Sequence, residues 1–532
     1  MHPVNQVQGI FQNAKQAYTR GDYVAAVKGF DQLLTQLGPR DDLLNMKALA
    51  LLAMGQLEAA ASAISKAIKL NPNMAGMHLN AARIYTGLSQ TKQVKRHIND
   101  AVKLSPREPS VLYQAALLSR ECNDYSKAQR ILERCLQVQP DFALAWHLQG
   151  ATLIDLGQFE DARKALEKAV ELEPGNAKAL SALIKLRGDS LVDTDSVAML
   201  EKIRASDAAP ADRGSATFSL AHLYRRDNQF QKAFELYHQA NQLTAPTRPF
   251  GLDAWMSHVD SLIAATSPES QFVPHQGSAG ANLVFIVGMP RSGTSLSEQV
   301  LSASPQVMAC GELAAMQHIE VSLYRQGVNP YADAADNQKL AKALKGAADL
   351  YLDNLPKDHQ KFAAVIDKAP MNFDRLGMIH QIFPAAKFIY CQRHPLDTIL
   401  SCYMQDFHAG LGFAFDLEQL SHVYVSHVRL MEHWQRVLPD SIYVLDYESM
   451  VSYLETQSRK LADFLNIPFD PAMLKPHLQE RAVVTASNVQ VRQPVYTSSI
   501  GNWENYRTEL DSCIQILQKH DILDEDLKPI RH

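Results

Sequence analysis

Several classes of protein are excluded by what this 532-residue sequence lacks. Its six cysteines are scattered, with no CxxC pair and no metal-ligand spacing, so neither a disulfide framework nor a metal site is expected. No apolar run approaches the roughly 18 residues that a membrane span needs. Residues 1–15 lack the basic and apolar segments of a secretory signal. These absences predict a reduced, cytoplasmic protein without a membrane span.

The chain also lacks an excess of basic charge. Its formal net charge is −5, and 20% of its residues are charged. Nucleic acids and anionic membranes attract basic surfaces, so neither is an expected partner. With 46% hydrophobic residues the chain has an ordinary globular composition, and its length predicts two or three domains rather than one.

A 34-residue period organises the N-terminal half. A small residue recurs just after a short polar turn, at Ala26, Ala60, Val94, Ala128 and Ala162. A proline recurs with the same period, at Pro72, Pro106, Pro140 and Pro174. The small residue allows two helices to approach closely, and the proline ends the second helix because it has no N–H to donate. The pattern predicts five helical hairpins between residues 8 and 174.

A further unit follows at residues 228–240, and residues 175–212 are expected to form a degenerate repeat. The pattern resembles the tetratricopeptide repeat (TPR) family, which implies an all-helical solenoid of about six to seven repeats over residues 1–243. TPR arrays commonly bind peptides or proteins, but a spacer or self-association role is the alternative. A proline-containing linker is expected at residues 244–281.

The chemistry is expected in the C-terminal half, which begins with an apolar, β-branched strand at residues 283–287. The sequence GMPRSGTS follows at residues 288–295, and then a helical stretch. A strand, a glycine-containing turn and a helix together direct backbone N–H groups toward a phosphate. Gly288 and Gly293 have the spacing of a Walker A loop, but Thr294 stands where that loop needs lysine. The cation of this loop is Arg291 instead.

A second strand, residues 387–392, ends in another candidate phosphate site. Arg393 follows it directly, and Ser401 lies eight residues later in a predicted helix. A guanidinium at a strand end can hold a phosphate with two hydrogen bonds, and the serine hydroxyl adds another donor.

Together, PRSGTS and the arginine–serine pair resemble the sulfotransferases that use 3′-phosphoadenosine 5′-phosphosulfate (PAPS). The resemblance spans about residues 282–510. It implies that Arg393 and Ser401 bind the 3′-phosphate of PAPS. It also implies a 5′-phosphosulfate loop formed by Arg291, Ser292, Gly293, Thr294 and Ser295.

Further elements of the same family are present. Cys310-Gly-Glu312 resembles the element whose glutamate is the catalytic base in tyrosylprotein sulfotransferases. Asp367-Lys368-Ala-Pro370 resembles the element whose lysine touches the leaving group, which makes Lys368, with Arg291, a catalytic candidate. Tyr447-Glu448 resembles an element that supports the cofactor pocket.

The last element is a loop that closes over the cofactor in these relatives. Ser487 and residues 498–503 resemble it. Asn502 stands where relatives often have a lysine or arginine before the tryptophan, so Arg492 or Arg507 is expected to supply the third cofactor cation.

The predicted architecture is an all-α TPR solenoid followed by an α/β three-layer, P-loop-like domain with a parallel sheet over residues 282–532. The predicted function is PAPS-dependent transfer of a sulfonyl group to a hydroxyl acceptor, with Glu312 as general base and no metal. The linker predicts that residues from about 270 onward bind the cofactor without the array. The alternatives are a TPR scaffold with an inactive sulfotransferase-like domain, or a P-loop phosphotransferase.

Two further points stay open in the sequence. Some sulfotransferases use histidine as the base, and the candidates are His318, His380, His394 and His408. The acceptor is a protein tyrosine, a polysaccharide or a small alcohol, and the array favours a polypeptide or another large acceptor. Residues 405–415 either line the acceptor cleft or form an aromatic core loop.

Overall fold

A computed structural model describes residues 3–187, 194–267, 277–331, 338–407, 410–479, 481–483, 485 and 487–530. The chain forms two compact units, Met1–Thr152 and Leu153–His532, which we call unit 1 and unit 2. No helix in the described ranges is long and apolar enough to cross a membrane.

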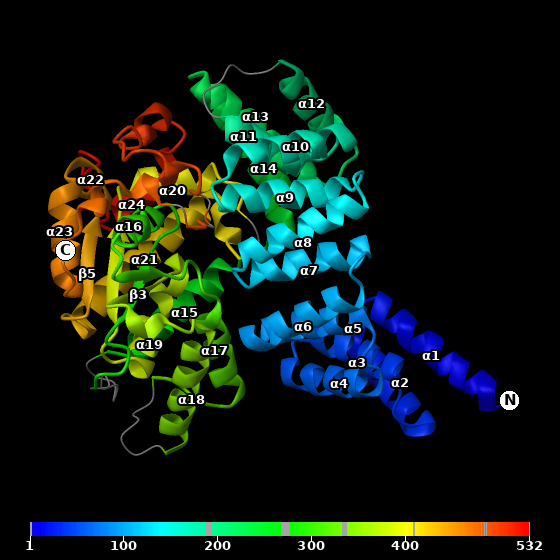
Figure 1. Cartoon of the computed structure of the whole chain (residues 1–532). Helices are drawn as coiled ribbons and strands as arrows, with labels where there is room; N and C mark the ends of the chain where they lie inside the picture. Colours follow the sequence, from blue (N-terminus) through cyan, green and yellow to red (C-terminus); the bar gives the residue numbers. More distant parts are fainter. Residues whose placement is uncertain are drawn as a thin grey trace. The chain divides into compact units, whose positions relative to one another are not determined.

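Unit 1 is a stack of antiparallel helical hairpins, coloured blue to cyan in Figure 1. Each hairpin packs on the next, α2 on α3, α4 on α5 and α6 on α7. Its helices are α1 (Pro3–Thr19), α2 (Tyr23–Leu37), α3 (Asp41–Ala53), α4 (Leu57–Leu70), α5 (Ala75–Gly87), α6 (Thr91–Leu104), α7 (Pro109–Glu121), α8 (Tyr125–Val138) and most of α9 (Ala143–Asp155).

The repeat pattern explains this packing. Ala26, Ala60 and Ala128 are all completely buried, as expected for small residues where two helices touch. The turn between the helices of a hairpin needs a left-handed backbone. Gly21 supplies it in the first repeat with φ of +83°, and Asn123 supplies it in a later one with φ of +58°. The predicted helical hairpins are confirmed.

Unit 2 begins with the remaining repeat helices. These are α10 (Phe159–Leu172), α11 (Ala177–Arg187), α12 (Thr194–Ala205), α13 (Pro210–Arg226) and α14 (Phe230–Thr244). The stretch expected as a degenerate repeat therefore contains two helices, α11 and α12. The stretch expected as a linker contains a short turn, η1 (Ala245–Thr247), and helix α15 (Leu252–Ala265), which packs on α21 and buries Val259 and Leu262.

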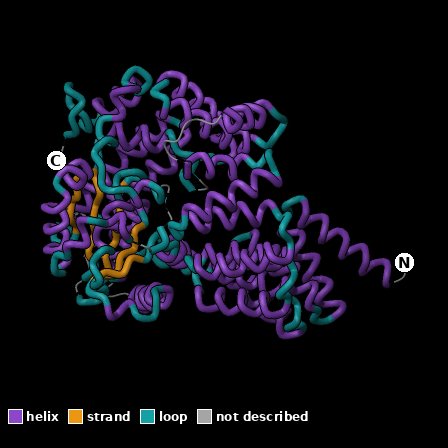
Figure 2. Tube along the Cα trace, turned by 45° about the horizontal axis from the view of Figure 1, so that its top comes forward, coloured by secondary structure: helices purple, strands orange, loops and turns teal. Residues whose placement is uncertain are grey.

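A five-stranded parallel sheet forms the centre of unit 2, and its strands gather in one place in Figure 2. The strand order is β2-β3-β1-β4-β5. The strands are β1 (Leu283–Gly288), β2 (Val307–Ala309), β3 (Ala364–Lys368), β4 (Lys387–Gln392) and β5 (Ile442–Asp446). The helices around them are α16 (Thr294–Leu301), α17 (Ala315–Arg325), α18 (Gln338–Asn354), α19 (Leu376–Ile382), α20 (Pro395–Tyr403), α21 (Leu417–Val437), α22 (Tyr447–Ser452), α23 (Leu454–Leu465) and α24 (Asp511–Lys519).

Helices cover both faces of the sheet, as the wholly buried strand β1 requires. Phe285 and Val287 pack with residues of α15, α17, α18, α19 and α21 on one face. Val284 and Ile286 pack with residues of α16, α22 and α23 on the other. The predicted three-layer α/β fold with a parallel sheet is confirmed.

The repeat helices of unit 2 share a hydrophobic core with the α/β layers. Leu220 and Tyr237 of the repeats are buried in one cluster with Ile399, Phe413 and Leu517. Polar contacts cross the same boundary, for example from Asn241 Nδ2 to the Tyr403 carbonyl oxygen at 3.0 Å. The boundary expected from the sequence therefore lies inside a continuous core, and the ability of residues beyond about 270 to fold alone stays a prediction.

Candidate active site

The site residues expected from the sequence follow the carboxyl ends of all five strands. Glu312 lies three residues after β2, Lys368 ends β3, and the glycine loop follows β1. Arg393 comes directly after β4, and Tyr447 directly after β5. Carboxyl ends of neighbouring parallel strands lie along one edge of a sheet, so the fold gathers these distant segments. Ligands of open α/β sheets bind at this edge.

The loop between β1 and α16 has a tightly constrained backbone. Gly288 has φ of +146°, and a Cβ there would lie 2.6 Å from the Cys391 carbonyl oxygen. A Cβ on Gly293, with φ of +101°, would lie 2.6 Å from Cδ2 of Tyr447. Arg291 also has a positive φ, +70°, which side-chain-bearing residues rarely adopt. Helix α16 follows, beginning with the buried Thr294 and Ser295.

Arg291 lies at the centre of a polar network. Its Nε donates to Ser401 Oγ at 3.0 Å, and one terminal nitrogen donates to Gln490 Oε1 at 2.8 Å. The other terminal nitrogen donates to Ser487 Oγ. The structure thus brings three predicted site residues together, Arg291, Ser401 and Ser487, and adds Gln490, which the sequence did not indicate.

A second guanidinium lies beside the first. Arg393 donates to the Arg291 carbonyl oxygen at 3.1 Å and to the Ser499 carbonyl oxygen at 2.6 Å. Burial lowers the pKa of Arg291, and the charge of Arg393 lowers it further. Within the described ranges, neither arginine has a carboxylate partner at ion-pair distance. Two neighbouring cations without a counter-charge form a site suited to an anion.

Two buried donors at this place, Ser292 Oγ and Arg393 Nε, have no hydrogen-bond partner among the described residues. One buried acceptor, Glu448 Oε2, also lacks a partner there. Leaving a buried donor unpaired costs about 1–3 kcal/mol, so such atoms are rare in a stable protein unless a ligand satisfies them. Ser292 Oγ and Arg393 Nε can each donate a hydrogen bond, and the oxygens of phosphate and sulfate accept such bonds.

The loop predicted to close over the cofactor lies against Arg393. The Arg393 guanidinium lies 4.8 Å above the Tyr447 ring, and the Tyr447 hydroxyl is 2.6 Å from Ser499 Oγ. The buried carboxylate of Asp397 accepts hydrogen bonds from two backbone N–H groups of this loop, those of Gly501 at 2.8 Å and Trp503 at 3.0 Å. Helix α20 therefore holds the loop in place.

At the other end of the edge, Lys368 and Glu312 form an ion pair. Lys368 Nζ donates to Glu312 Oε1 at 2.5 Å. The lysine side chain is completely buried, whereas half of the glutamate side chain is exposed. The loop before Glu312 is fixed by Glu298, which accepts from the Gly311 N–H at 3.0 Å. Glu312 thus presents a carboxylate to solvent beside a buried ammonium group.

A buried acid lies next to Lys368 in the chain. Asp367 accepts from the Tyr351 hydroxyl at 2.9 Å and from the Leu313 N–H at 3.4 Å. Burial raises the pKa of Asp367 to about 7, and the hydrogen bond from Tyr351 opposes this shift. These contacts tie β3 to the segment that follows Glu312.

The repeat helices of unit 2 also reach the site, which the sequence did not predict. The Asp155 carbonyl oxygen, at the end of α9, accepts from Arg492 at 3.0 Å and from the Val483 N–H at 2.8 Å. The Asp155 carboxylate accepts from Asn488 Nδ2 at 3.2 Å. Arg492 also donates to the Arg481 carbonyl oxygen at 2.8 Å. These contacts hold the segment that carries Ser487 and Gln490.

Two arginines were candidates for the third cofactor cation. Arg492 donates hydrogen bonds to backbone carbonyl oxygens. Arg507 is exposed. A further cation comes from helix α11. Lys185 is exposed. Its pKa is lowered, mainly because the surrounding protein replaces part of the water around the ammonium group. The charge of Asp406 raises this pKa, and the charge of Arg291 lowers it.

The histidines have structural contacts. His394 Nε2 is 3.0 Å from the Leu527 carbonyl oxygen, so this nitrogen carries a hydrogen. His380 is buried in α19, and burial lowers the pKa of His318 in α17. His408 lies outside the described residues, as does the residue after it. In the rest of residues 405–415, Phe413 and Phe415 are buried, which favours a core loop.

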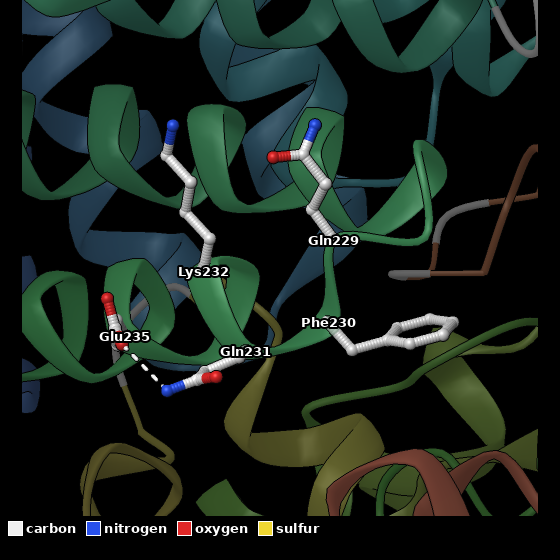
Figure 3. Close-up of a pocket in the computed structure, with 5 residues that line it drawn as sticks. All are labelled: Gln229, Phe230, Gln231, Lys232 and Glu235. Atoms are coloured by element: carbon white, nitrogen blue, oxygen red, sulfur yellow. Dashed lines mark hydrogen bonds between the residues drawn. The ribbon is translucent and has the colours of Figure 1, made fainter.

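A separate open hollow of about 440 Å³ lies at the start of α14, shown in Figure 3. It is lined by Gln229, Phe230, Gln231, Lys232 and Glu235. Gln231 Nε2 donates to Glu235 Oε1 at 3.5 Å, and Lys232 Nζ lies 3.8 Å above the Tyr224 ring. None of the predicted site residues lines this hollow.

Comparison with known families agrees with both halves of the chain. Residues 283–471 match the model of the Sulfotransferase family. Residues 41–74, 109–142 and 143–176 match models of the tetratricopeptide repeat. The chain therefore combines a sulfotransferase-family domain with tetratricopeptide repeats.

Individual relatives cover only parts of the chain. An uncharacterised protein of Aquifex aeolicus (strain VF5) is 34% identical over 342 residues, 61% of this chain and 44% of that protein. The protein-tyrosine sulfotransferase of Drosophila melanogaster is 24% identical over 243 residues, 42% of this chain and 46% of that protein. The chain thus spans less than half the length of either relative. The sulfotransferase domain of the Synechococcus PCC 7002 olefin synthase aligns with 47% of this chain and 98% of its own, with 20% identity and a TM-score of 0.34.

Proposed function

We propose that this chain is a PAPS-dependent sulfotransferase that acts on a hydroxyl group of a large acceptor. The observation that carries the proposal is the pair of neighbouring guanidiniums, Arg291 and Arg393, at the carboxyl edge of the sheet. Neither has a carboxylate partner among the described residues, and Ser292 Oγ and Arg393 Nε are unpaired donors beside them. A ligand with two separate anionic groups matches this arrangement.

The residues present fit PAPS. The loop of Arg291, Ser292, Gly293, Thr294 and Ser295 would hold the 5′-phosphosulfate, at the start of a helix where N–H groups favour an anion. Arg393 and Ser401 would hold the 3′-phosphate. Tyr447 and Ser487 would border the nucleotide. No metal is assigned to this site.

When bound, PAPS supplies an activated sulfonyl group with a phosphate as its leaving group. Glu312 accepts the proton of the acceptor hydroxyl, a role commonly worth about 10²–10⁴ in rate. Lys368 and Arg291 stabilise the negative charge that develops on the leaving phosphate. The ion pair between Lys368 and Glu312 holds the glutamate at the edge of the sheet.

The acceptor we propose is a polypeptide hydroxyl, such as that of tyrosine. One relative is named a protein-tyrosine sulfotransferase, and tetratricopeptide repeats commonly bind peptides. Incubation with PAPS and a panel of a tyrosine peptide, a polysaccharide and a small phenol, followed by mass spectrometry, tests this choice. Sulfation of the small phenol at the same kcat/KM as the peptide would contradict it.

Calorimetry tests the cofactor site. Adenosine 3′,5′-bisphosphate should bind at least about 10-fold more tightly than AMP, a difference of about 1.4 kcal/mol. Arg393→Ala should remove most of this preference, because the 3′-phosphate loses its cation. Arg436→Ala, which changes an exposed arginine near the end of α21, is the control. Equal affinities of the wild-type protein for both nucleotides would refute the assignment.

Turnover measurements test the base. Glu312→Gln keeps the size of the side chain but removes its charge, so kcat should fall by about 10²-fold or more with little change in nucleotide affinity. Glu418→Gln, at an exposed position of α21, should leave kcat unchanged. Normal turnover of Glu312→Gln, together with an inactive His318→Ala or His394→Ala, would identify histidine as the base.

A further inference from the structure

A second polar cluster lies in unit 1, within the hairpin of α5 and α6. His78 of α5 and His97 of α6 have their Nδ1 atoms 3.0 Å apart. Asp100, one turn after His97, has its Oδ2 3.6 Å from His78 Nδ1. The three potential ligand atoms all lie within 4.8 Å of one another. Both histidines are buried, with exposed fractions of 5% and 4%, and Asp100 is partly exposed.

The repeat period supplies an internal comparison for these positions. One period away, leucine occupies the place of His78, at Leu44 and Leu112. Alanine or isoleucine occupies the place of His97, at Ala63 and Ile131. The place of Asp100 holds a basic residue in three other repeats, at Lys66, Arg134 and Lys168. This single hairpin thus replaces two apolar core residues and one cation by three metal-ligand types.

The hydrogen bonding of His78 leaves a lone pair directed at the cluster. His78 Nε2 is 3.0 Å from the Pro72 carbonyl oxygen, which only accepts, so Nε2 carries the hydrogen. The Nδ1 atom of neutral His78 is then unprotonated. Metal-binding histidines commonly donate their second N–H to a carbonyl in this way, which fixes the ring and its tautomer. The Tyr85 ring stacks on His97 at 5.5 Å and orients it.

We propose that His78, His97 and Asp100 bind a divalent transition metal, with Zn²⁺ as the best match. Imidazole nitrogen and carboxylate oxygen are both good ligands of zinc, at about 2.0–2.2 Å. Two nitrogens of a tetrahedral zinc site lie about 3.3 Å apart by that geometry, so the observed 3.0 Å needs to open by only a few tenths of an ångström. Solvent at Asp100 leaves a fourth position for water.

Binding requires only a small change in protonation. In the metal-free hairpin the two Nδ1 atoms share one hydrogen, which His97 donates because Nδ1 of His78 accepts. On binding, this hydrogen moves to Nε2 of His97, and both Nδ1 atoms become ligands without net release of a proton. The ion would join α5 to α6 and so stabilise this repeat.

Titration of the full-length protein, after removal of metals with a chelator, tests the site. Calorimetry with ZnCl₂ should show one site of micromolar affinity or tighter, and Co²⁺ should give the visible absorption bands of tetrahedral coordination. The double variant His78→Leu/His97→Ala carries the residues of neighbouring repeats and should fold, as judged by circular dichroism. It should bind Zn²⁺ at least about 100-fold more weakly and lose the Co²⁺ bands.

The control is His147→Gln, which changes a histidine of the array outside the cluster and should keep wild-type affinity. Asp100→Asn should weaken binding by about 10-fold or more. Equal Zn²⁺ affinity of the double variant and the wild type would place the metal elsewhere and overturn the proposal. Absence of Zn²⁺ binding by the wild-type protein would overturn it as well.

Discussion

The repeats of unit 1 and those of unit 2 follow the same 34-residue pattern but have different surroundings. The position directly after the recurring small residue is never aromatic in unit 1, where it holds Val27, Ala61, Lys95 and Gln129. In the last repeat of unit 2 the same position is Phe234, which packs on Tyr403 and Tyr506 of the α/β layers. The aromatic side chain at this position thus distinguishes the repeat that packs on the α/β layers.

The turns between helices differ in the same way. The Gly21 turn in unit 1 has open space around it, because a Cβ there would meet no atom within 4 Å. The equivalent Gly157 turn in unit 2 is covered by Arg492, whose guanidinium a Cβ would approach to 2.5 Å. Gly21 thus serves only the backbone conformation of its turn, whereas Gly157 also leaves space for the Arg492 side chain. Equivalent repeats can stand in an array or form part of the core of an α/β domain.

The strongest test of this difference is truncation. Removal of residues 1–140 should leave a folded protein that binds adenosine 3′,5′-bisphosphate with near wild-type affinity. Removal of residues 1–243 should prevent folding, because it uncovers Leu396, Ile399, Phe413 and Phe415. At about 1.5–3 kcal/mol each, these four side chains represent a large part of the roughly 5–15 kcal/mol that stabilises a protein.

Thermal melting and calorimetry distinguish the two truncations. A soluble, cooperatively melting protein that lacks residues 1–243 and binds nucleotide normally would show that the α/β layers do not need the repeats. The expectation from the linker-like composition of residues 244–281 would then be correct, and the shared core would be unimportant for folding.

A single substitution in the contact between the repeats and the site should have an intermediate effect. Arg492→Ala removes the donors to the carbonyl oxygens of Asp155 and Arg481, and so loosens the segment that holds Ser487 and Gln490 on Arg291. Nucleotide affinity should fall by about tenfold, or roughly 1.4 kcal/mol. Calorimetry measures this effect, and Arg436→Ala at an exposed position of α21 is the control. If Arg492→Ala left both the nucleotide affinity and the melting temperature unchanged, the segment with Ser487 and Gln490 would be held in place without Arg492.

The smallest effect is expected from a cap in unit 1. Asp22 accepts from the Ala25 N–H at 3.0 Å and caps α2. Asp22→Ala should destabilise unit 1 by about 1 kcal/mol, because a helix N–H loses its partner. Nucleotide affinity should stay at the wild-type value, since the cap lies outside unit 2. Chemical denaturation followed by circular dichroism measures the loss, and Asp22→Asn, which keeps the acceptor, should restore most of it.

Much of this structure could be predicted because its signals are local. The 34-residue period determined the hairpins, and the apolar run before GMPRSGTS indicated the buried strand. The rule that parallel strands end at one edge predicted a common place for the two phosphate loops, whereas Glu312 and Lys368 were indicated by the family resemblance alone. Whether these residues bind PAPS and transfer a sulfonyl group stays a prediction.

The remaining features depend on contacts that no local pattern encodes. Asp155 and Asn488 are 333 residues apart, and nothing in either segment indicates the other. The helix α15 was missed because the prolines and weak periodicity of residues 244–281 resemble a linker, although Val259 and Leu262 are buried in the core. The cluster of His78, His97 and Asp100 was missed because its ligands come from two helices, with a spacing that matches no common metal motif.

The shared core of unit 2 also affects how the protein is made. Ser215 of α13 contacts Asp406, which lies 191 residues later in the chain. At synthesis rates of roughly 5–20 residues per second, α13 and α14 wait about 10–40 s for the segments that cover Phe218 and Phe234. During that time the ribosome carries a repeat array with an aromatic face open to water. A holding chaperone would then limit aggregation of the nascent chain.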